Sequence, residues 1–300
     1  MTDDVKVKYP VARMHKFLHS APQFRPIKRG SRRRGIERKY TSADGNQTLT
    51  MMLFYELDIA DQDLLLCLIA MAMATDKSTI VSAEPTQEIN MILREKLKLD
   101  GELVTKMPAI SCATTGYEIL TELNRSTGAS GYRWLEDSLK RLSGVSFVYK
   151  TLKSINTFHL MSWSAKLTDK GRLDGISFCI NPYSAVAIFG EKGGYALLHR
   201  GERAQLSRDE AKGLHSILCG WVDLGGESTF SVDVLADKLY SRYDEVIGQD
   251  AREWRRKGVT KGCEELNKLG YWSCSVVGRG SKATVVVSRK KPIESDRRIK

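Results

Sequence analysis

The stretch DAREWRRKGVTKGCEELNKLGYWSCSVVGRGSKATVVVSRKK, residues 250–291, decides the fold of this 300-residue chain. Its first half holds five basic residues within ten positions and ends at Gly270, a residue type that commonly stops helices. Its second half has two runs rich in β-formers, Tyr271–Val277 and Ala283–Ser288, on either side of a Gly-Arg-Gly-Ser turn. The stretch therefore predicts a basic helix followed directly by a β-hairpin.

The predicted helix has an apolar side and a basic side. At about 100° per residue, Val259 and Leu266 fall in one arc, whereas Lys257 and Lys261 point roughly opposite. A solvated surface helix would also carry lysines and arginines, so the helix alone does not settle the question. If it binds DNA, the expected contacts from the helix and the hairpin turn are Arg252, Arg255, Arg256, Lys257, Lys261, Arg279 and Lys282.

Two helical patterns and a short strand precede the basic helix. The spacing from Ser207 to Glu210 matches a capping box, and apolar residues then recur at helical intervals. Ser231–Tyr240 predicts a second helix capped by Ser231, and the strand is expected near residues 229–230. This is the element order of a winged helix-turn-helix, whose last helix enters the DNA major groove while its hairpin reaches the neighbouring backbone.

The first half of the chain has a similar order of patterns. Ile59–Ala74, with Asp58 as a possible cap, predicts an opening helix, Val104–Ile110 a strand, and Thr115–Arg125 a second helix. Ser130 is expected to cap a third helix, followed by wing strands in residues 145–151 and 157–163. The leucine spacing of SLKRLSGVSF (138–147) and ELNKLGYWS (265–273) is shared, which suggests an internal duplication.

The third helix of the first half is less basic than its counterpart. Its candidate DNA contacts, Arg133 and Lys140, are offset by Glu136 and Asp137. We therefore expect the second domain to read bases and the first to hold DNA backbone or a partner.

The N-terminal 40 residues carry 12 Lys/Arg against 3 Asp/Glu. Residues 25–39, RPIKRGSRRRGIERK, hold eight basic residues and too few apolar ones for a core. We expect an extended arm that orders on DNA, with Arg32, Arg33 and Arg34 as contacts. A solvated segment without a partner is the alternative. A membrane-surface helix is a poor one, because proline and glycine break any amphipathic face. Residues 36–43 and 47–55 flank an Asp-Gly-Asn turn and predict a hairpin.

The expected fold class is α+β, with two tandem winged-helix domains and a basic N-terminal arm. The boundaries are residues 1–39 for the arm, 40–190 for the first domain, 191–291 for the second domain and main DNA reader, and 292–300 for a C-terminal tail.

Composition argues against several classes of function. The net charge is +11, and the longest apolar run, Leu64–Ala74, is too short to span a bilayer. Without a signal-peptide pattern or any Cys-x-x-Cys pair, a cytoplasmic protein with reduced thiols is expected. The chain lacks a P-loop motif, and His15 and His19 lack the glutamate of an H-E-x-x-H metal site. We therefore expect a binding protein with no catalytic residues, metal or cofactor.

Four stretches carry a resemblance to a known family. They are FRPIKRGSRRR (24–34), LDIADQDLLLCLIAMA (57–72), GRLDGISFCINPYSAVAIFG (171–190) and LHSILCGWVDLGGESTFSVDVL (214–235). With them the chain resembles the replication protein C (RepC) initiators of IncQ-type plasmids. The resemblance implies two winged-helix domains that bind direct repeats (iterons) in the double-stranded DNA of a plasmid origin. It further implies opening of an adjacent A/T-rich segment and recruitment of plasmid-encoded helicase and primase. A homodimer is compatible with this interpretation.

Two other interpretations remain open at this stage. A winged-helix transcriptional repressor with a duplicated domain would bind a promoter without melting DNA, and an initiator that represses its own operon would combine both activities. A nicking enzyme using Tyr240 or Tyr243 would need a metal site that the sequence does not show.

Overall fold

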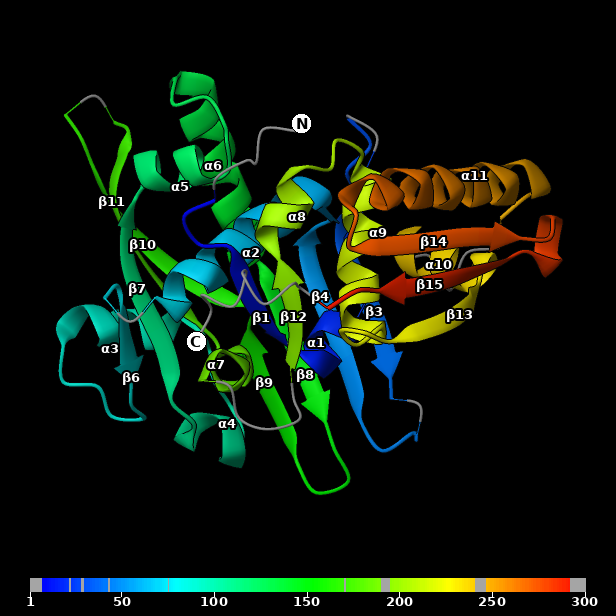
Figure 1. Cartoon of the computed structure of the whole chain (residues 1–300). Coiled ribbons are helices and arrows are strands. Elements are labelled where there is room, and N and C mark those ends of the chain that lie inside the picture. The colour runs from blue at the N-terminus through cyan, green and yellow to red at the C-terminus, as the bar shows by residue number, and fades with distance from the viewer. Residues whose placement is uncertain are drawn as a thin grey trace. The chain divides into compact units, whose positions relative to one another are not determined.

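The computed structural model describes residues 7–21, 23–27, 30–42, 44–74, 76–169, 171–189, 195–240 and 247–291. The chain divides into two compact units. The N-terminal unit comprises Val7–Gln23 and Ile27–Arg200, and the described part of the C-terminal unit comprises Phe24–Pro26 and residues 201–291. Both units combine helices with antiparallel strands (Figure 1), which confirms the α+β class. The expected tail, 292–300, lies outside the described residues.

The C-terminal unit contains helices and a three-stranded sheet. Its elements are β2 (Phe24–Arg25), α8 (Arg200–Ala204, which begins at the unit boundary), α9 (Asp209–Trp221), β13 (Glu227–Ser231), α10 (Val232–Tyr240), α11 (Gln249–Leu266), the 3₁₀ turns η1 (Asn267–Leu269) and η2 (Gly280–Lys282), β14 (Trp272–Val277) and β15 (Thr284–Arg289). β15 is the central strand, with β13 and β14 on its two sides. The predicted order of helix, strand, helix, basic helix and hairpin is confirmed.

The boundaries of these helices follow from local chemistry. The Ser231 hydroxyl accepts the Asp233 N–H at 3.2 Å, so the predicted cap of α10 is confirmed. Gly270 has φ 70°, a left-handed conformation that ends the helical run. Ser207 does not cap α9. Its backbone N–H and its hydroxyl both donate to the Glu265 carboxylate on α11, and this contact links the start of α9 to the end of α11.

The N-terminal unit contains three sheets and seven helices within the described residues. The helices are α1 (Lys16–Ser20), α2 (Ile59–Met73), α3 (Glu88–Lys96), α4 (Glu102–Lys106), α5 (Gly116–Glu122), α6 (Ala129–Ser143) and α7 (Pro182–Phe189). The strands are β1 (Val11–His15), β3 (Arg34–Thr41), β4 (Thr48–Tyr55), β5 (Leu57–Asp58), β6 (Ser78–Val81), β7 (Ala109–Thr115), β8 (Val145–Lys150), β9 (Ile155–His159), β10 (Met161–Leu167), β11 (Leu173–Ile180) and β12 (Tyr195–His199). The sheets have the strand orders β3-β4-β8-β9, β10-β11-β7-β6 and β1-β12.

Helix α2 lies at the core of the N-terminal unit. Twelve of its fifteen residues are buried, which explains why its sequence is apolar on all sides from Leu64 onward. Asp58 and Asp61 form a reciprocal capping box at its start, so the predicted cap is confirmed. The expected strand at 104–110 is wrong, because α4 occupies its first part and β7 starts at Ala109. Ser130 lies inside α6, whose cap position is Gly128.

The prediction of an extended N-terminal arm is wrong for the residues that the structure describes. Val11–His15 pairs with Tyr195–His199 as the β1–β12 ladder. Phe24–Pro26 belongs to the C-terminal unit. Arg34–Thr41 pairs with β4 in the predicted hairpin. The segment therefore contributes strands to both units, although its own composition is poor in apolar residues.

The hairpin that pairs with β7 is not the one that the sequence predicted as a wing. β8 and β9 form a hairpin, but β8 pairs with β4, in a sheet that does not contain β7. The hairpin that pairs with β7 is β10–β11, with β11 in the centre. The order β7-β11-β10 matches the order β13-β15-β14 of the C-terminal unit. In each unit the first strand of this order precedes two helices along the chain, and the other two strands form the hairpin that follows those helices. The units thus share one arrangement, with β8–β9 inserted in the first.

No helix in the described part of the chain is both long enough and apolar enough to cross a membrane.

Candidate nucleic-acid interface

The solvent side of α11 carries three of the predicted basic residues. Arg252, Lys257 and Lys261 are exposed. Val259, Cys263 and Leu266 on the other side are buried, with exposed fractions of 0–1%. The predicted division of this helix into a core side and a basic side is therefore present in the structure.

The other two predicted residues of α11 have internal partners. Arg255 is 5% exposed, and its guanidinium lies 5.7 Å from the centre of the Tyr240 ring. Arg256 donates from Nε and Nη2 to the Asp233 carboxylate at 2.6 and 2.8 Å, and these bonds lower the pKa of Asp233. Burial removes Arg255 from the candidate surface, and Arg256 is held against α10.

Two glycines let α11 approach the rest of the unit closely. A Cβ atom at Gly262 would lie 2.6 Å from Leu214 Cδ1, and one at Gly258 would lie 2.1 Å from the Tyr240 hydroxyl. At either position a larger residue would force the neighbouring side chain or α11 itself to shift. The four-residue spacing places both glycines on the same side of α11, so they fix how far the basic face projects.

The hairpin places two more cations beside the N-terminal half of α11. Arg279 and Lys282 are exposed at its tip, where Gly278 and Gly280 have φ values of 84° and 61°. Figure 1 shows that β14 runs back along α11, so that the tip lies toward the N-terminal end of the helix. Arg279 and Lys282 therefore lie at the same end of the C-terminal unit as Arg252.

A buried polar cluster supports the base of this hairpin. The Glu202 carboxylate accepts the Trp272 indole N–H at 2.9 Å and contacts His215 Nε2 at 3.0 Å. Burial alone lowers the pKa of His215, but Cys219 and the Glu202 carboxylate outweigh it and raise the pKa to about 9. His215 is therefore an imidazolium near neutral pH, and its ion pair connects α8, α9 and β14.

In the N-terminal unit, Arg32 is part of a buried ion-pair cluster. Its guanidinium pairs with Asp58 and, at 2.9 Å, with Asp61. Asp61 is fully buried and also accepts from Arg141 at 2.7 Å and from the Ser138 hydroxyl at 2.5 Å. Burial would raise the pKa of Asp61, but these donors hold it below its usual value.

The guanidinium groups of Arg33 and Arg34 have different kinds of neighbour. The Arg33 guanidinium lies 3.1 Å from the buried Glu56 carboxylate, which Arg38 contacts at the same distance. Arg34 is exposed and stacks at 5.0 Å from the centre of the Tyr55 ring. The three predicted DNA contacts therefore differ in surroundings: Arg32 is half-buried in its ion pairs, whereas Arg33 and Arg34 are both exposed, Arg33 beside the Glu56 carboxylate; whether they contact DNA stays a prediction.

A second basic and aromatic surface surrounds the start of α6. Arg125 stacks on the Trp134 ring at 3.6 Å, and Arg172, from the β10–β11 turn, lies 6.0 Å from the centre of the Tyr132 ring. Arg133 is exposed between these two aromatics. The predicted Lys140 is exposed but pairs with Glu136 at 2.6 Å. Sequence reasoning missed Arg172 and the exposed Lys166, because it assigned the wing to β8–β9, and it missed Arg125, which lies between α5 and α6.

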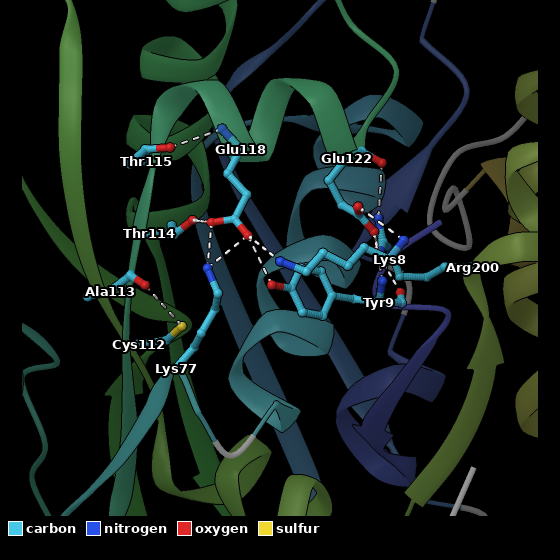
Figure 2. A network of polar contacts seen from close by, with 10 residues as sticks. All are labelled: Lys8, Tyr9, Lys77, Cys112, Ala113, Thr114, Thr115, Glu118, Glu122 and Arg200. Atoms are coloured by element: carbon cyan, nitrogen blue, oxygen red, sulfur yellow. Dashed lines mark hydrogen bonds and ion pairs between the residues drawn. The ribbon is translucent and has the colours of Figure 1, made fainter. Parts of the chain in front are cut away.

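Helix α5, which precedes α6, is fixed by the polar network of Figure 2. The Glu118 carboxylate accepts from Lys77 Nζ at 2.7 and 2.8 Å, from Thr114 at 2.8 Å and from the Tyr9 hydroxyl at 2.9 Å. Although burial would raise it, these donors lower the pKa of Glu118 to about 2. Glu122 accepts the Tyr9 N–H at 3.0 Å and pairs with Arg200 at 2.9 Å.

The described residues contain no group of three or more His, Cys, Asp or Glu side chains arranged to hold a metal ion.

Comparison with known proteins identifies the family. The family model for replication protein C (RepC) matches residues 11–282. No curated protein matches the chain. Two crystal structures of domains 2 and 3 of RctB are similar in fold, with TM-scores of 0.56 and 0.55 and identities of 11% and 10%; the matches cover 89% and 92% of this chain and 95% and 97% of theirs.

A third similar structure is the Pi initiator protein in complex with iteron DNA. Its TM-score is 0.51 at 11% identity, with 93% of this chain and 96% of that chain covered. At such low identities these likenesses concern the fold alone. The family model, in contrast, spans most of the sequence, and the chain belongs to the replication protein C (RepC) family.

Proposed function

We propose that the chain is a plasmid replication initiator of the IncQ type, which binds iterons in double-stranded origin DNA through two tandem winged-helix modules. One observation carries the proposal. Both units place a hairpin beside the strand that precedes two helices, in the orders β7-β11-β10 and β13-β15-β14. This is the arrangement in which a helix can enter the major groove while the hairpin follows the backbone. The fold shared with the Pi initiator, whose structure contains iteron DNA, supports it.

In the proposal the C-terminal module reads the sequence. Arg252 lies in the first turn of α11 and has the fork of donors that suits guanine. Lys257 and Lys261 follow on the exposed face, and Arg279 and Lys282 reach phosphates from the hairpin tip. The Arg256–Asp233 pair fixes the helix against α10 and leaves the exposed cations to the DNA.

The N-terminal module contacts DNA mainly through the backbone. Its exposed cations Arg133, Lys166 and Arg172 come from α6 and the β10–β11 hairpin, the same two elements as in the other module. Arg125 and Arg172 lie against Trp134 and Tyr132, so both guanidinium groups are held in place before DNA binds. Such contacts orient the protein on the duplex and carry little sequence information.

Later steps of replication initiation complete the proposal. Occupied iterons promote opening of an adjacent A/T-rich segment and recruit helicase and primase, and a homodimer is one form of the protein. The chain acts by binding and not by catalysis. The RepC family match supports a role in replication initiation, and the absence of a P-loop motif from the sequence argues against ATP-driven unwinding by this chain itself.

Fluorescence anisotropy on an iteron duplex and a scrambled duplex tests the DNA-binding step. Lys257→Ala with Lys261→Ala should weaken binding to both duplexes. The matched control is Lys96→Ala with Lys153→Ala, which removes two exposed charges from the N-terminal unit outside the proposed surface. Equal loss in both double variants would mean that net charge and not α11 directs binding. Permanganate footprinting on supercoiled origin plasmid then separates an initiator from a repressor, because only the initiator exposes unpaired thymines.

A further inference from the structure

Trp254 is a tryptophan on the surface of α11. All five tryptophans lie in the described part of the chain, and Trp254, at 58%, is the only one of them that is exposed. A single apolar side chain at a protein surface is common, so exposure alone says little about function. The position of this side chain on α11 is more informative.

The indole lies on the solvent side of α11, in a row with two lysines. At about 100° per residue, Lys261 lies about 20° and Lys257 about 60° from Trp254 around the helix, and the row spans about 10 Å along the axis. Both lysines are exposed, whereas Cys263, on the opposite side of the helix, is 1% exposed. Trp254 therefore belongs to the face of α11 that the proposed function turns toward DNA.

The acidic residues of α11 are Asp250, Glu253, Glu264 and Glu265. Glu253 and Glu264 lie about 100° and 80° from Trp254, on one flank of the row. The Glu265 carboxylate accepts from the backbone N–H groups of Ser207 at 2.5 Å and Arg208 at 3.2 Å, at the start of α9. Asp250 is in the first turn, where the helix dipole stabilises a carboxylate. Two lysines against this one aspartate leave the row around the indole with a net positive charge.

The buried Tyr240 holds the inner edge of the indole. Its ring lies 5.0 Å from that of Trp254 at an angle of 45°, and Tyr240 itself is 2% exposed. An aromatic side chain has few torsions to fix, and one that is already packed along an edge loses little conformational entropy on binding. The outer part of the indole is therefore a rigid apolar surface beside two cations.

The chemistry of the major groove indicates what such a surface can recognise. The edges of the base pairs present hydrogen-bond donors and acceptors, together with one apolar group, the C5 methyl of thymine. Arginine and lysine match the polar groups better than an indole does. A flat apolar ring between cations that bind phosphate is therefore suited to the thymine methyl.

We propose that Trp254 is a specificity-determining residue, which contacts the C5 methyl group of a thymine in the major groove of the iteron. The inference rests on the proposed function, because it takes α11 as the helix that enters the groove. It adds a base contact that depends on an apolar group and not on charge.

Replacing thymine with uracil tests this contact, because uracil presents the same hydrogen-bonding edge and lacks only the methyl group. Fluorescence anisotropy of the full chain is measured on iteron duplexes in which each thymine is replaced in turn. Burial of one methyl group corresponds to about a fourfold change in affinity. The wild-type chain should therefore lose affinity about fourfold at one thymine, or at two neighbouring ones.

The same scan on variants assigns this methyl effect to the indole. In Trp254→Ala and in Trp254→Gln the effect should disappear, whereas Trp254→Phe should retain part of it through its apolar ring. Lys257→Ala is the matched control from the same row, and it should weaken binding to every duplex alike while keeping the methyl effect. Thermal unfolding establishes that each variant is folded before DNA is added.

The outcomes separate this inference from the proposed function. A wild-type chain without preference for the iteron over a scrambled duplex overturns the proposed function, and this inference with it. If that preference is present, a uracil scan without any methyl effect overturns the inference alone. A methyl effect that persists undiminished in the folded alanine or glutamine variant does the same.

Discussion

At the scale of single residues, buried carboxylates determine what the N-terminal arginines do. Asp61 and Glu56 are both 0% exposed, and a carboxylate without a partner at such positions is strongly unfavourable. Arg32 and Arg33 provide the compensating charge. Their role follows from the acids that the fold buries, and these acids are 20 or more residues away in sequence.

Replacing Arg32 should therefore reduce stability and not DNA affinity. Arg32→Ala removes one of two guanidinium partners of Asp61, and we expect a loss of about 1–3 kcal/mol in urea unfolding. Arg34→Ala, an exposed arginine two positions away, should cost less than about 0.5 kcal/mol. If Arg32→Ala leaves unfolding unchanged but flattens the salt dependence of DNA binding, Arg32 contacts phosphate after all.

The His215–Glu202 pair predicts a pH dependence of the C-terminal unit. The folded pKa of about 9 lies above the ordinary value of 6.5, so folding favours the protonated ring. The resulting stabilisation is complete below pH 6.5 and is lost as pH rises through 9, by up to about 3 kcal/mol. Calorimetric melts from pH 6 to 10 should show this decline. In Glu202→Gln the dependence should become smaller, because Cys219 and Glu202 together raise the pKa and the variant removes one of them, and an identical profile in the variant would exclude the ion pair as a source.

At the scale of elements, the close approach of α11 to α9 depends on Gly262. Gly262→Ala adds a methyl group 2.6 Å from Leu214 Cδ1 and 3.3 Å from the Ala211 nitrogen. Because Leu214 is fully buried and the nitrogen belongs to the backbone, we expect the helix to move outward. We expect a loss of about 1–3 kcal/mol in stability. Iteron affinity should fall even at temperatures where the variant is fully folded, because the basic face is displaced. Gly175→Ala, where a Cβ meets nothing within 4 Å, is the control. Normal affinity in folded Gly262→Ala would show that the spacing is not critical.

The elements that sequence predicted correctly are those specified by local signals. The cap at Ser231, the amphipathic pattern of α11, the stop at Gly270 and the Gly-rich turn of β14–β15 all lie within a few residues of what they determine. Sequence could not show which sheet each strand joins. β8 follows α6 as a wing strand would, yet it pairs with β4, about 100 residues earlier.

The candidate site was predictable to a similar extent. The helical periodicity of the sequence predicts exposed cations on α11. The structure agrees for Arg252, Lys257 and Lys261, which are all exposed. Arg255 and Arg256 were assigned by charge alone, but Tyr240 and Asp233 hold them through contacts between helices. Arg172 was missed because only the pairing of β11 with β7 places its turn in the hairpin next to that strand.

At the scale of the whole molecule, the charge that is available to DNA is less symmetric than the charge in the sequence. The sequence has basic segments at both ends, with 12 Lys/Arg in residues 1–40 and 14 in residues 246–300. In the N-terminal segment, Arg32, Arg33 and Arg38 have buried carboxylate partners. Its strands β1 and β3 are also part of the fold, so deleting residues 1–39 would remove β1 and most of β3 from the N-terminal unit.

Substitution rather than truncation therefore separates the contributions of the two units to DNA binding. Each phosphate neutralised contributes about −0.9 to the slope of log K against log salt. Lys257→Ala, Lys261→Ala, Arg279→Ala and Lys282→Ala together should flatten the slope by up to about 3.6. Arg133→Ala, Lys166→Ala and Arg172→Ala in the N-terminal unit should flatten it by up to about 2.7.

The ratio of iteron to scrambled-DNA affinity distinguishes the two kinds of contact. The N-terminal triple variant should lose affinity for both duplexes alike, because its cations meet only phosphate. Arg252→Ala should lose about 1–3 kcal/mol on the iteron alone, since a base contact has no counterpart on scrambled DNA. Salt titrations of each variant on both duplexes measure slope and ratio together. A collapsed ratio in the N-terminal variant would make that unit a reader of sequence, and an unchanged ratio in Arg252→Ala would move base recognition away from the first turn of α11.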